Sequence, residues 1–125
     1  AQNYSAVTAA ALAIRKSVYH EVGGLDAENL AVAFNDVDFC LRVKEAGYRN
    51  IYTPFAELYH HESVSRGSDT APIKAKRFEL EAVYMKKKWT SYIENDPAYN
   101  SNLSLVAGYK IDLERGQKWP WYYRR

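Results

Sequence analysis

The segment from Asn35 to Ala46 gives the clearest helix signal in the chain, and it divides the remaining residues into an upstream and a downstream part. Asparagine is a favourable N-cap residue, and Asp38 follows it at the spacing of a capping box. Gly47 comes directly after the segment and predicts its end, because glycine adopts the left-handed conformation without a Cβ clash. The apolar stripe expected on this helix consists of Val37, Cys40, Leu41 and the aliphatic stem of Lys44.

Upstream of this helix, the sequence predicts one strand and one shorter helix. Residues 7–14 are small and apolar, which favours a buried strand, although their alanines also favour a helix. Residues 15–22 carry two valines four positions apart, which predicts a short amphipathic helix. The pair Gly23-Gly24 predicts the end of that helix.

Downstream, a strand is expected over residues 48–52 and ends before Pro54, because proline cannot continue a ladder. Pro72 suits the first position of a long helix. The apolar face expected on that helix consists of Phe78, Ala82, Met85 and Trp89. The other segments expected are an extended path over 56–59, a polar loop over 60–69 and a turn over 96–100.

The composition is that of a folded domain with no strong charge. The chain has 125 residues, of which 47% are apolar, so it can bury a core. A net charge of +2, from 17 basic and 15 acidic residues, is too small to predict nucleic-acid binding. The single cysteine, Cys40, excludes an internal disulfide and a cysteine-type metal site. The mixed order of strands and helices predicts an α/β or α+β fold.

Two features of the sequence concern its cellular context. No apolar run approaches the roughly 20 residues of a membrane helix, so we expect no membrane segment in this chain. The first residues show no signal-peptide pattern, and the absence of an initial methionine predicts that the chain was cut from a longer protein.

The first chemical candidate is Asn35-Asp36-Val37-Asp38 at the helix start. An aspartate there can act as a general base on a hydroxyl if it faces a cleft. Acidic residues in a first helical turn more often have a structural role, because they interact favourably with the helix dipole. Asp38 can also pair with Arg42 one turn later. The two acids lie two residues apart and point about 200° apart around the helix, so one can cap while the other faces a ligand.

The second candidate is the segment from His60 to Gly67. Imidazole is a common metal ligand, but neighbouring histidines on an extended chain point to opposite sides, so at most one of His60 and His61 would enter a given site. Ser63, Ser65 and Arg66 could hold a phosphate. An ordinary solvated loop explains the same residues, and local sequence leaves both interpretations open.

Other conspicuous residues have simpler explanations. Cys40 lies on the buried stripe of its helix, where we expect it to pack rather than act as a nucleophile. Lys86-Lys87-Lys88 suits a solvated helix end, where the dipole favours cations.

The order of these signals is more specific than any one of them. The matching segments, in chain order, are Thr8-Ala9-Ala10, Ala13-Ile14-Arg15-Lys16, Val22-Gly23-Gly24-Leu25-Asp26, Phe34-Asn35-Asp36-Val37-Asp38-Phe39-Cys40-Leu41-Arg42, Ala46-Gly47-Tyr48, Pro54 and His60. Together they resemble the C-terminal, acceptor-side half of an inverting family-2 glycosyltransferase with the GT-A fold. The stretch from Glu62 to Gly67 resembles members that build bacterial surface polysaccharides and O-antigen, of the rhamnosyltransferase type.

The resemblance implies a mechanism and roles for particular residues. Such enzymes use a nucleotide-diphosphate sugar and a divalent metal, Mn²⁺ or Mg²⁺, and Asp36 matches the base that deprotonates the acceptor hydroxyl. Asp38 and Arg42 match positions that orient the helix start and acceptor pocket, and Gly23 and Gly24 match a turn close to the acceptor. His60 matches a metal ligand, with His61 the second choice. Ser65 and Arg66 are the candidates for binding the diphosphate of the donor.

The sequence departs from the family pattern at two positions, Asn35 and the pair Ala9-Ala10, where the family usually has one glycine, and it lacks one part of the family's structure. Asn35 replaces the usual glutamate before the catalytic aspartate, which puts that residue's acceptor contact in doubt. The nucleotide-binding half with its Asp-x-Asp metal motif is missing, so we expect this fragment to be inactive alone. In the longer protein, the partners would be a nucleotide-diphosphate sugar donor and a glycan or lipid-linked acceptor. We expect that protein in the cytoplasm or at the inner membrane face. The exposed apolar surface of the fragment predicts self-association.

The resemblance also predicts domain limits. Residues 1–70 would be the acceptor-side core of a partial, Rossmann-like GT-A α/β fold, and residues 71–125 a helical extension with an uncertain tail. Two other function classes stay open: a non-catalytic module that binds a glycan or protein through aromatic residues, and a metal-dependent hydrolase that uses Asp36, Asp38 and His60.

Overall fold

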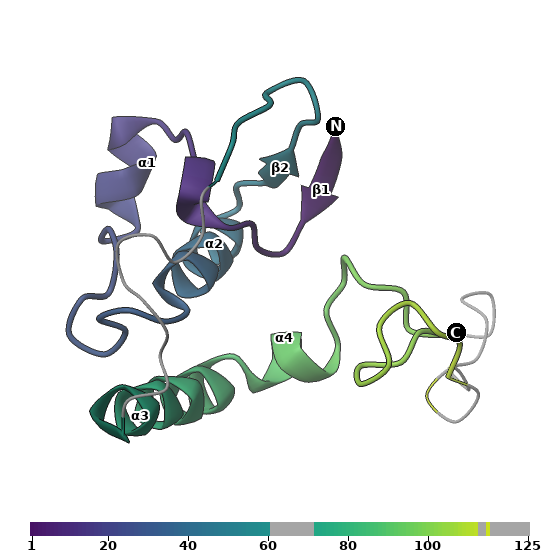
Figure 1. The fold of residues 1–125 in the computed structure, drawn as a ribbon. Helices are drawn as coiled ribbons and strands as arrows, with labels where there is room; N and C mark the ends of the chain where they lie inside the picture. The colour runs from purple at the N-terminus through teal and green to yellow at the C-terminus, as the bar shows by residue number, and fades with distance from the viewer. Residues whose placement is uncertain (61–71, 113–114, 116–125) are drawn as a thin grey trace. The chain divides into compact units, whose positions relative to one another are not determined.

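A computed structural model describes residues 1–60, 72–112 and 115 of the chain. It divides into two compact units, Ala1–Thr90 and Ser91–Arg125, which are considered separately below. The described elements mix short strands with helices, in agreement with the predicted α/β composition (Figure 1). The predicted boundary between residues 70 and 71 lies outside the described residues. Within the described residues, no helix is long and apolar enough to cross a membrane.

The strands of the first unit form a small antiparallel sheet. β1 (Gln2–Tyr4) pairs with β2 (Asn50–Tyr52), with Tyr4 opposite Asn50. The rings of Tyr4 and Tyr52 meet edge to face at 6.2 Å between centroids. The strand predicted over residues 48–52 is therefore confirmed, although it begins two residues later.

The buried strand predicted over residues 7–14 was wrong. The structure has a 3-10 helix, η1 (Ala9–Ala11), in which the Thr8 hydroxyl accepts a hydrogen bond from the Ala10 N–H. None of residues 7–14 is buried. Alanine favours helical backbone and is depleted in strands, and the strand that pairs with β2 comes from residues 2–4 instead.

The first α-helix and its glycine stop match the prediction. α1 (Lys16–Glu21) ends where Gly23 donates to the His20 carbonyl and Gly24 donates to the Tyr19 carbonyl. This pair of bonds is a Schellman motif, and both glycines have positive φ, +83° and +67°. A Cβ on Gly24 would lie 2.9 Å from the Tyr19 hydroxyl oxygen, so a side chain at this position would have to displace the Tyr19 ring.

The central helix forms as predicted but begins differently. α2 (Asn35–Glu45) has Phe34 as its N-cap residue, with no capping hydrogen bond from a side chain. The predicted Asn35 cap and its capping box with Asp38 were therefore wrong. Asp38 points into the interior, where three charged or polar donors bind it more strongly than a helix end would.

The long helix α3 (Pro72–Lys88) begins at the predicted proline and is followed by α4 (Thr90–Glu94). On the predicted apolar face, Met85 and Trp89 are buried, whereas Phe78 stays 46% exposed. The prediction of a core stripe is confirmed for its C-terminal half. The buried apolar residues of this unit are Val18, Leu30, Phe39, Cys40, Leu41, Val43, Met85 and Trp89.

After α4, the described residues of the second unit are mainly turns and bends. Asp96 accepts a hydrogen bond from the Ala98 N–H at the turn predicted over residues 96–100. Leu103 and Ile111 form an isolated antiparallel bridge. Arg115 donates to the carbonyls of Leu103 and Glu94 and so ties the segments of this unit together.

Candidate functional site

The start of α2 holds Asp36 in a defined orientation. One carboxylate oxygen accepts a hydrogen bond from the Ala9 N–H of η1 at 3.0 Å. The other accepts from the Val37 N–H at 2.9 Å. The side chain is half-buried, so it is oriented by backbone groups but still reached by solvent. A carboxylate in this setting can receive a proton from a bound hydroxyl.

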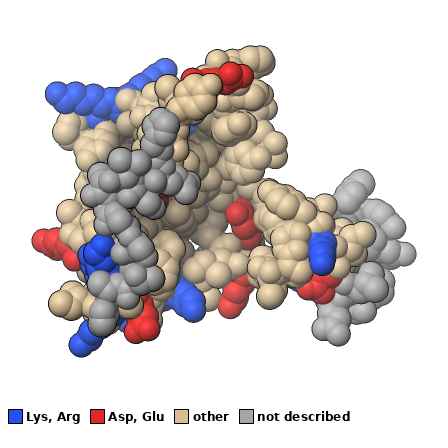
Figure 2. All heavy atoms as spheres, viewed as in Figure 1, with Lys and Arg blue, Asp and Glu red and all other residues tan. Residues whose placement is uncertain are grey.

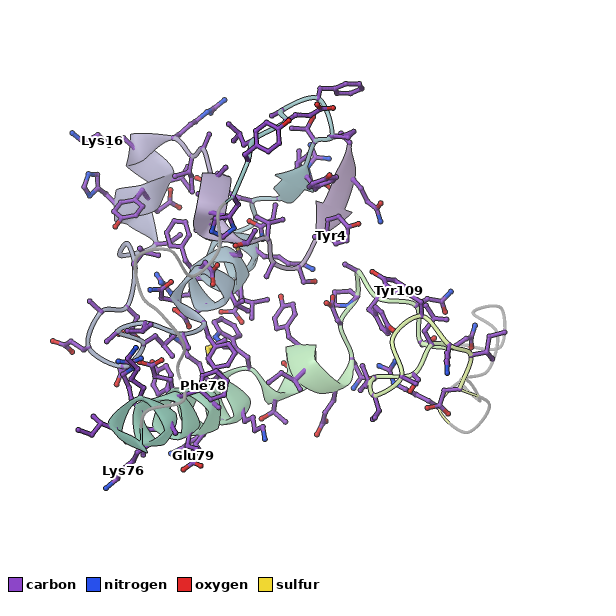
Figure 3. The ribbon with its side chains drawn as sticks, viewed as in Figure 1. Tyr4, Lys16, Lys76, Phe78, Glu79 and Tyr109 are labelled. Carbon is purple, nitrogen blue, oxygen red and sulfur yellow. The ribbon has the colours of Figure 1, made fainter. Side chains whose placement is uncertain are left out.

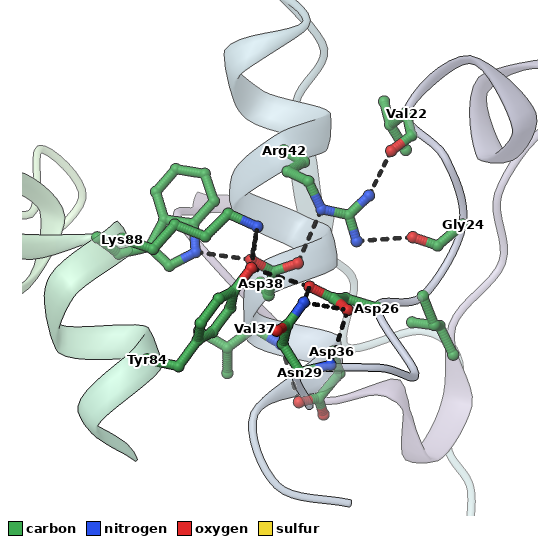
Figure 4. A network of polar contacts seen from close by, with 12 residues as sticks. Val22, Gly24, Asp26, Asn29, Asp36, Val37, Asp38, Arg42, Tyr84 and Lys88 are labelled. Carbon is green, nitrogen blue, oxygen red and sulfur yellow. Dashed lines mark hydrogen bonds and ion pairs between the residues drawn. The ribbon is translucent and has the colours of Figure 1, made fainter. Parts of the chain in front are cut away.

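Asp38 has a different environment from Asp36. Its side chain is fully buried, and one oxygen accepts from Trp89 Nε1 at 2.8 Å and from Lys88 Nζ at 2.7 Å (Figure 4). The other oxygen accepts from Arg42 Nε at 2.8 Å. The predicted pairing of Asp38 with Arg42 is confirmed. Asp38 is therefore enclosed by protein groups and anchors two helices.

Arg42 extends this network to the glycine turn after α1. Its guanidinium donates to the Val22 carbonyl and, at 2.6 Å, to the Gly24 carbonyl (Figure 4). The guanidinium also lies over the Phe39 ring, 5.6 Å from its centroid. The structure thus links Asp38 and Arg42 to the turn at Gly23 and Gly24.

The charged groups of the network shift each other's pKa values. Burial, the largest single influence, raises the pKa of Asp38, but hydrogen bonds from Lys88, Arg42 and Trp89 together hold it below the usual value. Burial lowers the pKa of Lys88, but the contact with Asp38 raises it above the usual value overall. Both shifts favour the ion pair, so Asp38 stays ionised near neutral pH.

The residue before the motif has an unusual backbone. Phe34 has φ +62°, a left-handed conformation that is rare for a bulky side chain. Its ring packs against Phe78 of α3, 5.2 Å between centroids. Strained backbone of this kind persists only where the surroundings hold it, and it clusters at functional sites.

Helix α3 fixes the loop that leads into the motif. The Glu81 side chain is buried, and its two oxygens accept from the Val32 N–H at 3.3 Å and the Ala33 N–H at 2.7 Å. One turn further, the Tyr84 hydroxyl donates to Asp26 at 3.0 Å. The loop over residues 26–33 is therefore held from α3 at two places.

Sequence reasoning missed these contributions from α3. Lys88 was expected at a solvated helix end, but it pairs with buried Asp38, so that expectation was wrong for Lys88. Glu81, Tyr84 and Lys88 lie at i, i+3 and i+7, on one face of the helix. A polar stripe at that spacing beside an apolar one is the signal that could have found these three residues. Local sequence could not show that the partners of these three side chains lie about 50 residues upstream.

Cys40 packs in the core, as predicted. Its side chain is 1% exposed, and its sulfur donates to the Val7 carbonyl at 3.5 Å. Burial raises the pKa of the thiol, so the reactive thiolate is disfavoured.

Residues predicted for metal and diphosphate binding are only partly described. His60 is exposed, whereas His61, Ser65 and Arg66 lie outside the described residues. Across residues 1–60, 72–112 and 115, no group of three His, Cys, Asp or Glu side chains could hold a metal ion. These residues alone do not fit a metal site, and His60 could supply only one ligand.

Comparisons with known proteins give matches over most of the chain. It is 56% identical over 104 residues to the uncharacterized protein y4gI of Sinorhizobium fredii, covering 83% of this chain and 11% of that protein. It is 35% identical over 114 residues to the O-antigen biosynthesis protein RfbC of Myxococcus xanthus, covering 85% of this chain and 8% of that protein.

A shorter match involves an N-acetylglucosaminyl-diphospho-decaprenol L-rhamnosyltransferase of Mycobacterium tuberculosis. The identity is 40% over 60 residues, covering 48% of this chain and 19% of that enzyme. No family model matches the chain. No solved structure matches it.

These similarities agree with the expected relationship at a coarse level. The names of two relatives, an O-antigen biosynthesis protein and a rhamnosyltransferase, support a glycosyltransferase-like class. The chain spans about a tenth of the first two relatives, 11% and 8% of their length.

Proposed function

We propose that this chain provides the acceptor side of an inverting glycosyltransferase, with Asp36 as the general base. The observation that carries the proposal is the separation of the two acids of the motif. Asp38 is enclosed in an ion-pair network, whereas Asp36 is half-buried and oriented by two backbone N–H groups. The sequence relationship to O-antigen and rhamnosyltransferase proteins supports the same class.

The proposed step is a direct displacement at the sugar. The acceptor hydroxyl gives its proton to Asp36 while its oxygen forms a bond to the anomeric carbon. The bond from that carbon to the donor phosphate breaks, and the nucleoside diphosphate leaves with the electron pair. A positioned carboxylate base typically contributes about 10²–10⁴-fold to such a rate.

The neighbouring residues would position the base and the acceptor. Asp38 and Arg42 link α2 to the glycine turn, so the acceptor would lie against Gly23, Gly24 and the start of α2. Asn35 lies beside Asp36, and its side-chain amide can donate a hydrogen bond to a hydroxyl of the acceptor sugar or accept one from it. In this proposal, Phe34 holds the motif in one orientation through its left-handed backbone.

Donor binding would require residues beyond the described ones. The proposal keeps His60 as a candidate ligand for Mn²⁺ or Mg²⁺, with the other ligands supplied elsewhere, and keeps Ser65 and Arg66 as candidate diphosphate contacts. Proton transfer to Asp36 does not depend on the identity of the metal. The acceptor would be a glycan or lipid-linked sugar, in the cytoplasm or at the inner membrane face.

The test measures sugar transfer by the full-length natural protein that contains these residues. A panel of nucleotide-diphosphate sugars and acceptors, with Mn²⁺ or Mg²⁺, identifies the active pair. Replacement of Asp36→Asn should lower kcat by about 10²–10⁴-fold while nucleotide binding survives. The matched control is Glu28→Gln, which changes an exposed carboxylate of the same unit and should leave kcat unchanged. An unchanged kcat for Asp36→Asn would show that Asp36 only orients the helix start.

A second candidate function is glycan binding without catalysis, and one feature of the second unit favours it. A hollow of about 270 Å³ there is slightly below the roughly 300–1,000 Å³ of typical ligand sites, which suits a single sugar ring. Its lining combines hydrogen-bonding groups with the apolar face of one aromatic ring, Tyr99. The lining residues are Asn95, Asp96, Pro97, Tyr99, Ser101 and Arg115.

This second candidate is tested on the isolated chain by NMR titration with methyl glycosides. Sugar binding should shift the amide signals of the lining residues, without metal or nucleotide. Replacement of Ser101→Leu should fill the hollow and abolish the shifts, whereas Ser91→Leu, at an exposed serine of the same unit, should not. Equal effects of the two variants would exclude the hollow as a sugar site.

A further inference from the structure

Helix α3 has an outward face that makes no contribution to the network described above. Ile73, Leu80 and Val83 are 86%, 64% and 63% exposed. Single exposed apolar residues are common, but a contiguous exposed apolar patch often marks an interaction site.

The exposed residues form a continuous stripe. Positions 73, 76, 80, 83 and 87 follow each other at alternating intervals of three and four, which places them on one helical face. We call this set the outer stripe; it consists of Ile73, Lys76, Leu80, Val83 and Lys87.

The opposite face of α3 already holds the helix in the unit. Glu81, Met85 and Lys88 point to the interior, and the Phe78 ring packs on Phe34. Figure 3 shows Lys76 pointing away from the body of the unit, on the side opposite to Phe78. The contacts that fix α3 are therefore made without the outer stripe.

Charge on this side of the helix is mainly positive. The outer stripe contains two lysines and no acidic residue, and Glu79 lies beside it rather than in it. Figure 2 shows basic and acidic side chains together at the lower left, where Figure 1 places α3, so the excess of positive charge is a property of the outer stripe itself. The stripe thus combines aliphatic tips with ammonium groups of one sign.

We propose that the outer stripe binds the surface of a membrane rich in anionic lipid headgroups. Aliphatic side chains of an interfacial helix enter the boundary between headgroups and acyl chains. Lysine stems follow the apolar surface while their ammonium groups meet lipid phosphates. The helix would lie parallel to the membrane, with the network of Asp38 on its opposite side.

A second copy of the chain fits the stripe less well. In a helix-to-helix seam, Lys76 and Lys87 would occupy core positions of the repeat with no carboxylate in the stripe to pair with them. An anionic lipid surface supplies the missing negative charge and leaves the ammonium groups hydrated. Membrane binding of this kind does not depend on the proposed transfer reaction.

The experiment measures binding of the 125-residue chain to vesicles by cosedimentation. Vesicles that mix phosphatidylglycerol with phosphatidylcholine should bind the chain, and vesicles of phosphatidylcholine alone should bind it much more weakly. Rising salt should release it. Replacement of Lys76→Gln and Lys87→Gln should weaken binding about fivefold for each lysine.

Matched variants separate the stripe from general charge. Lys16→Gln with Lys110→Gln removes the same net charge at exposed positions outside α3 and should leave binding unchanged. Leu80→Gln should weaken binding, whereas Val106→Gln, at a 96% exposed valine, should not. Circular dichroism confirms that each variant is folded.

Three results would overturn the proposal. They are an absence of binding to anionic vesicles, equal loss of binding in the stripe and control variants, and a dimer in sedimentation equilibrium that Leu80→Gln dissociates while vesicles do not bind. The last result would assign the outer stripe to an interface between copies.

Discussion

At the scale of single residues, the motif separates into one exposed base candidate and one buried anchor. Asp36 and Asp38 are two positions apart, so helical geometry directs them to different sides of α2. Asp36 keeps access to solvent, whereas Asp38 is enclosed by Arg42, Lys88 and Trp89. The two aspartates therefore have different roles because their side chains point to different sides of the helix.

Replacement of Asp38→Asn should destabilise the chain strongly. The change removes the negative charge that pairs with Lys88 and Arg42, whose side chains are 31% and 19% exposed. Since both cations keep some hydration, we expect a loss of about 2–3 kcal/mol in the free energy of unfolding, measured by urea denaturation. Asp36→Asn is the comparison and should cost about 1 kcal/mol or less. Equal effects would show that the network does not stabilise the fold.

Acid should weaken the fold through Asp38. Its pKa is lower in the folded chain than the usual value of 3.8, so the unfolded state binds a proton more readily. The stabilisation is therefore complete well above pH 3.8 and is lost as the pH falls through the lower, folded-state pKa. Asp26, whose pKa is lowered mainly by the Asn29 backbone N–H, adds to the same loss. Urea denaturation across acidic pH should show a smaller loss in Asp38→Asn than in the wild type.

At the scale of elements, α3 positions residues that lie far upstream. It holds the 32–33 backbone through Glu81, the loop at Asp26 through Tyr84, and α2 through Lys88. Trp89, the residue after its end, also donates to Asp38 of α2. A helix that appeared from its sequence to supply only an apolar face thus also carries a polar one. Its contribution to the site is the orientation of the segment before Asp36.

Replacement of Glu81→Gln should loosen the loop before the motif. A glutamine offers one carbonyl oxygen in place of the two oxygens that accept from Val32 and Ala33. We expect a loss of about 1–3 kcal/mol in the free energy of unfolding. Hydrogen exchange should also become faster at the amides of Val32 and Ala33. Glu79→Gln, an exposed glutamate on the same helix, should change neither; similar results for both would refute the role of Glu81.

At the scale of the whole molecule, the described residues enclose little apolar surface. Among residues 1–60, 72–112 and 115, the buried apolar side chains all belong to the first unit, while Phe55, Leu58 and Tyr59 are 89%, 71% and 97% exposed. Hydrophobic burial is the main stabilising contribution to folding, so a small core gives low stability.

We therefore expect a free energy of unfolding near or below about 5 kcal/mol, measured by urea denaturation. The exposed aromatic segment should also make the chain self-associate as its concentration rises in sedimentation velocity. Phe55→Ser with Tyr59→Ser should reduce association without lowering stability, because both rings are almost fully exposed. A monomer at all concentrations would contradict this expectation.

The sequence by itself determined the local structure around the candidate site. The pair Gly23-Gly24 placed the end of α1 correctly and Pro72 placed the start of α3, because backbone conformation at glycine and proline depends on their own covalent structure. The spacing of Asp38 and Arg42 also predicted their contact, since one helical turn brings them together.

Only the tertiary structure decided the start of α2 and the partners of its acids. The Asn35 cap was wrong because Asp38 binds Lys88 and Trp89 in the interior instead of completing a capping box. The strand that pairs with β2 comes from residues 2–4, whereas the alanines of residues 9–11 follow their own preference for helical backbone. The contact of Asp36 with the Ala9 N–H and that of Glu81 with the Ala33 N–H likewise join segments distant in sequence. Local patterns contain no information about such pairs, because their geometry exists only once the chain has folded.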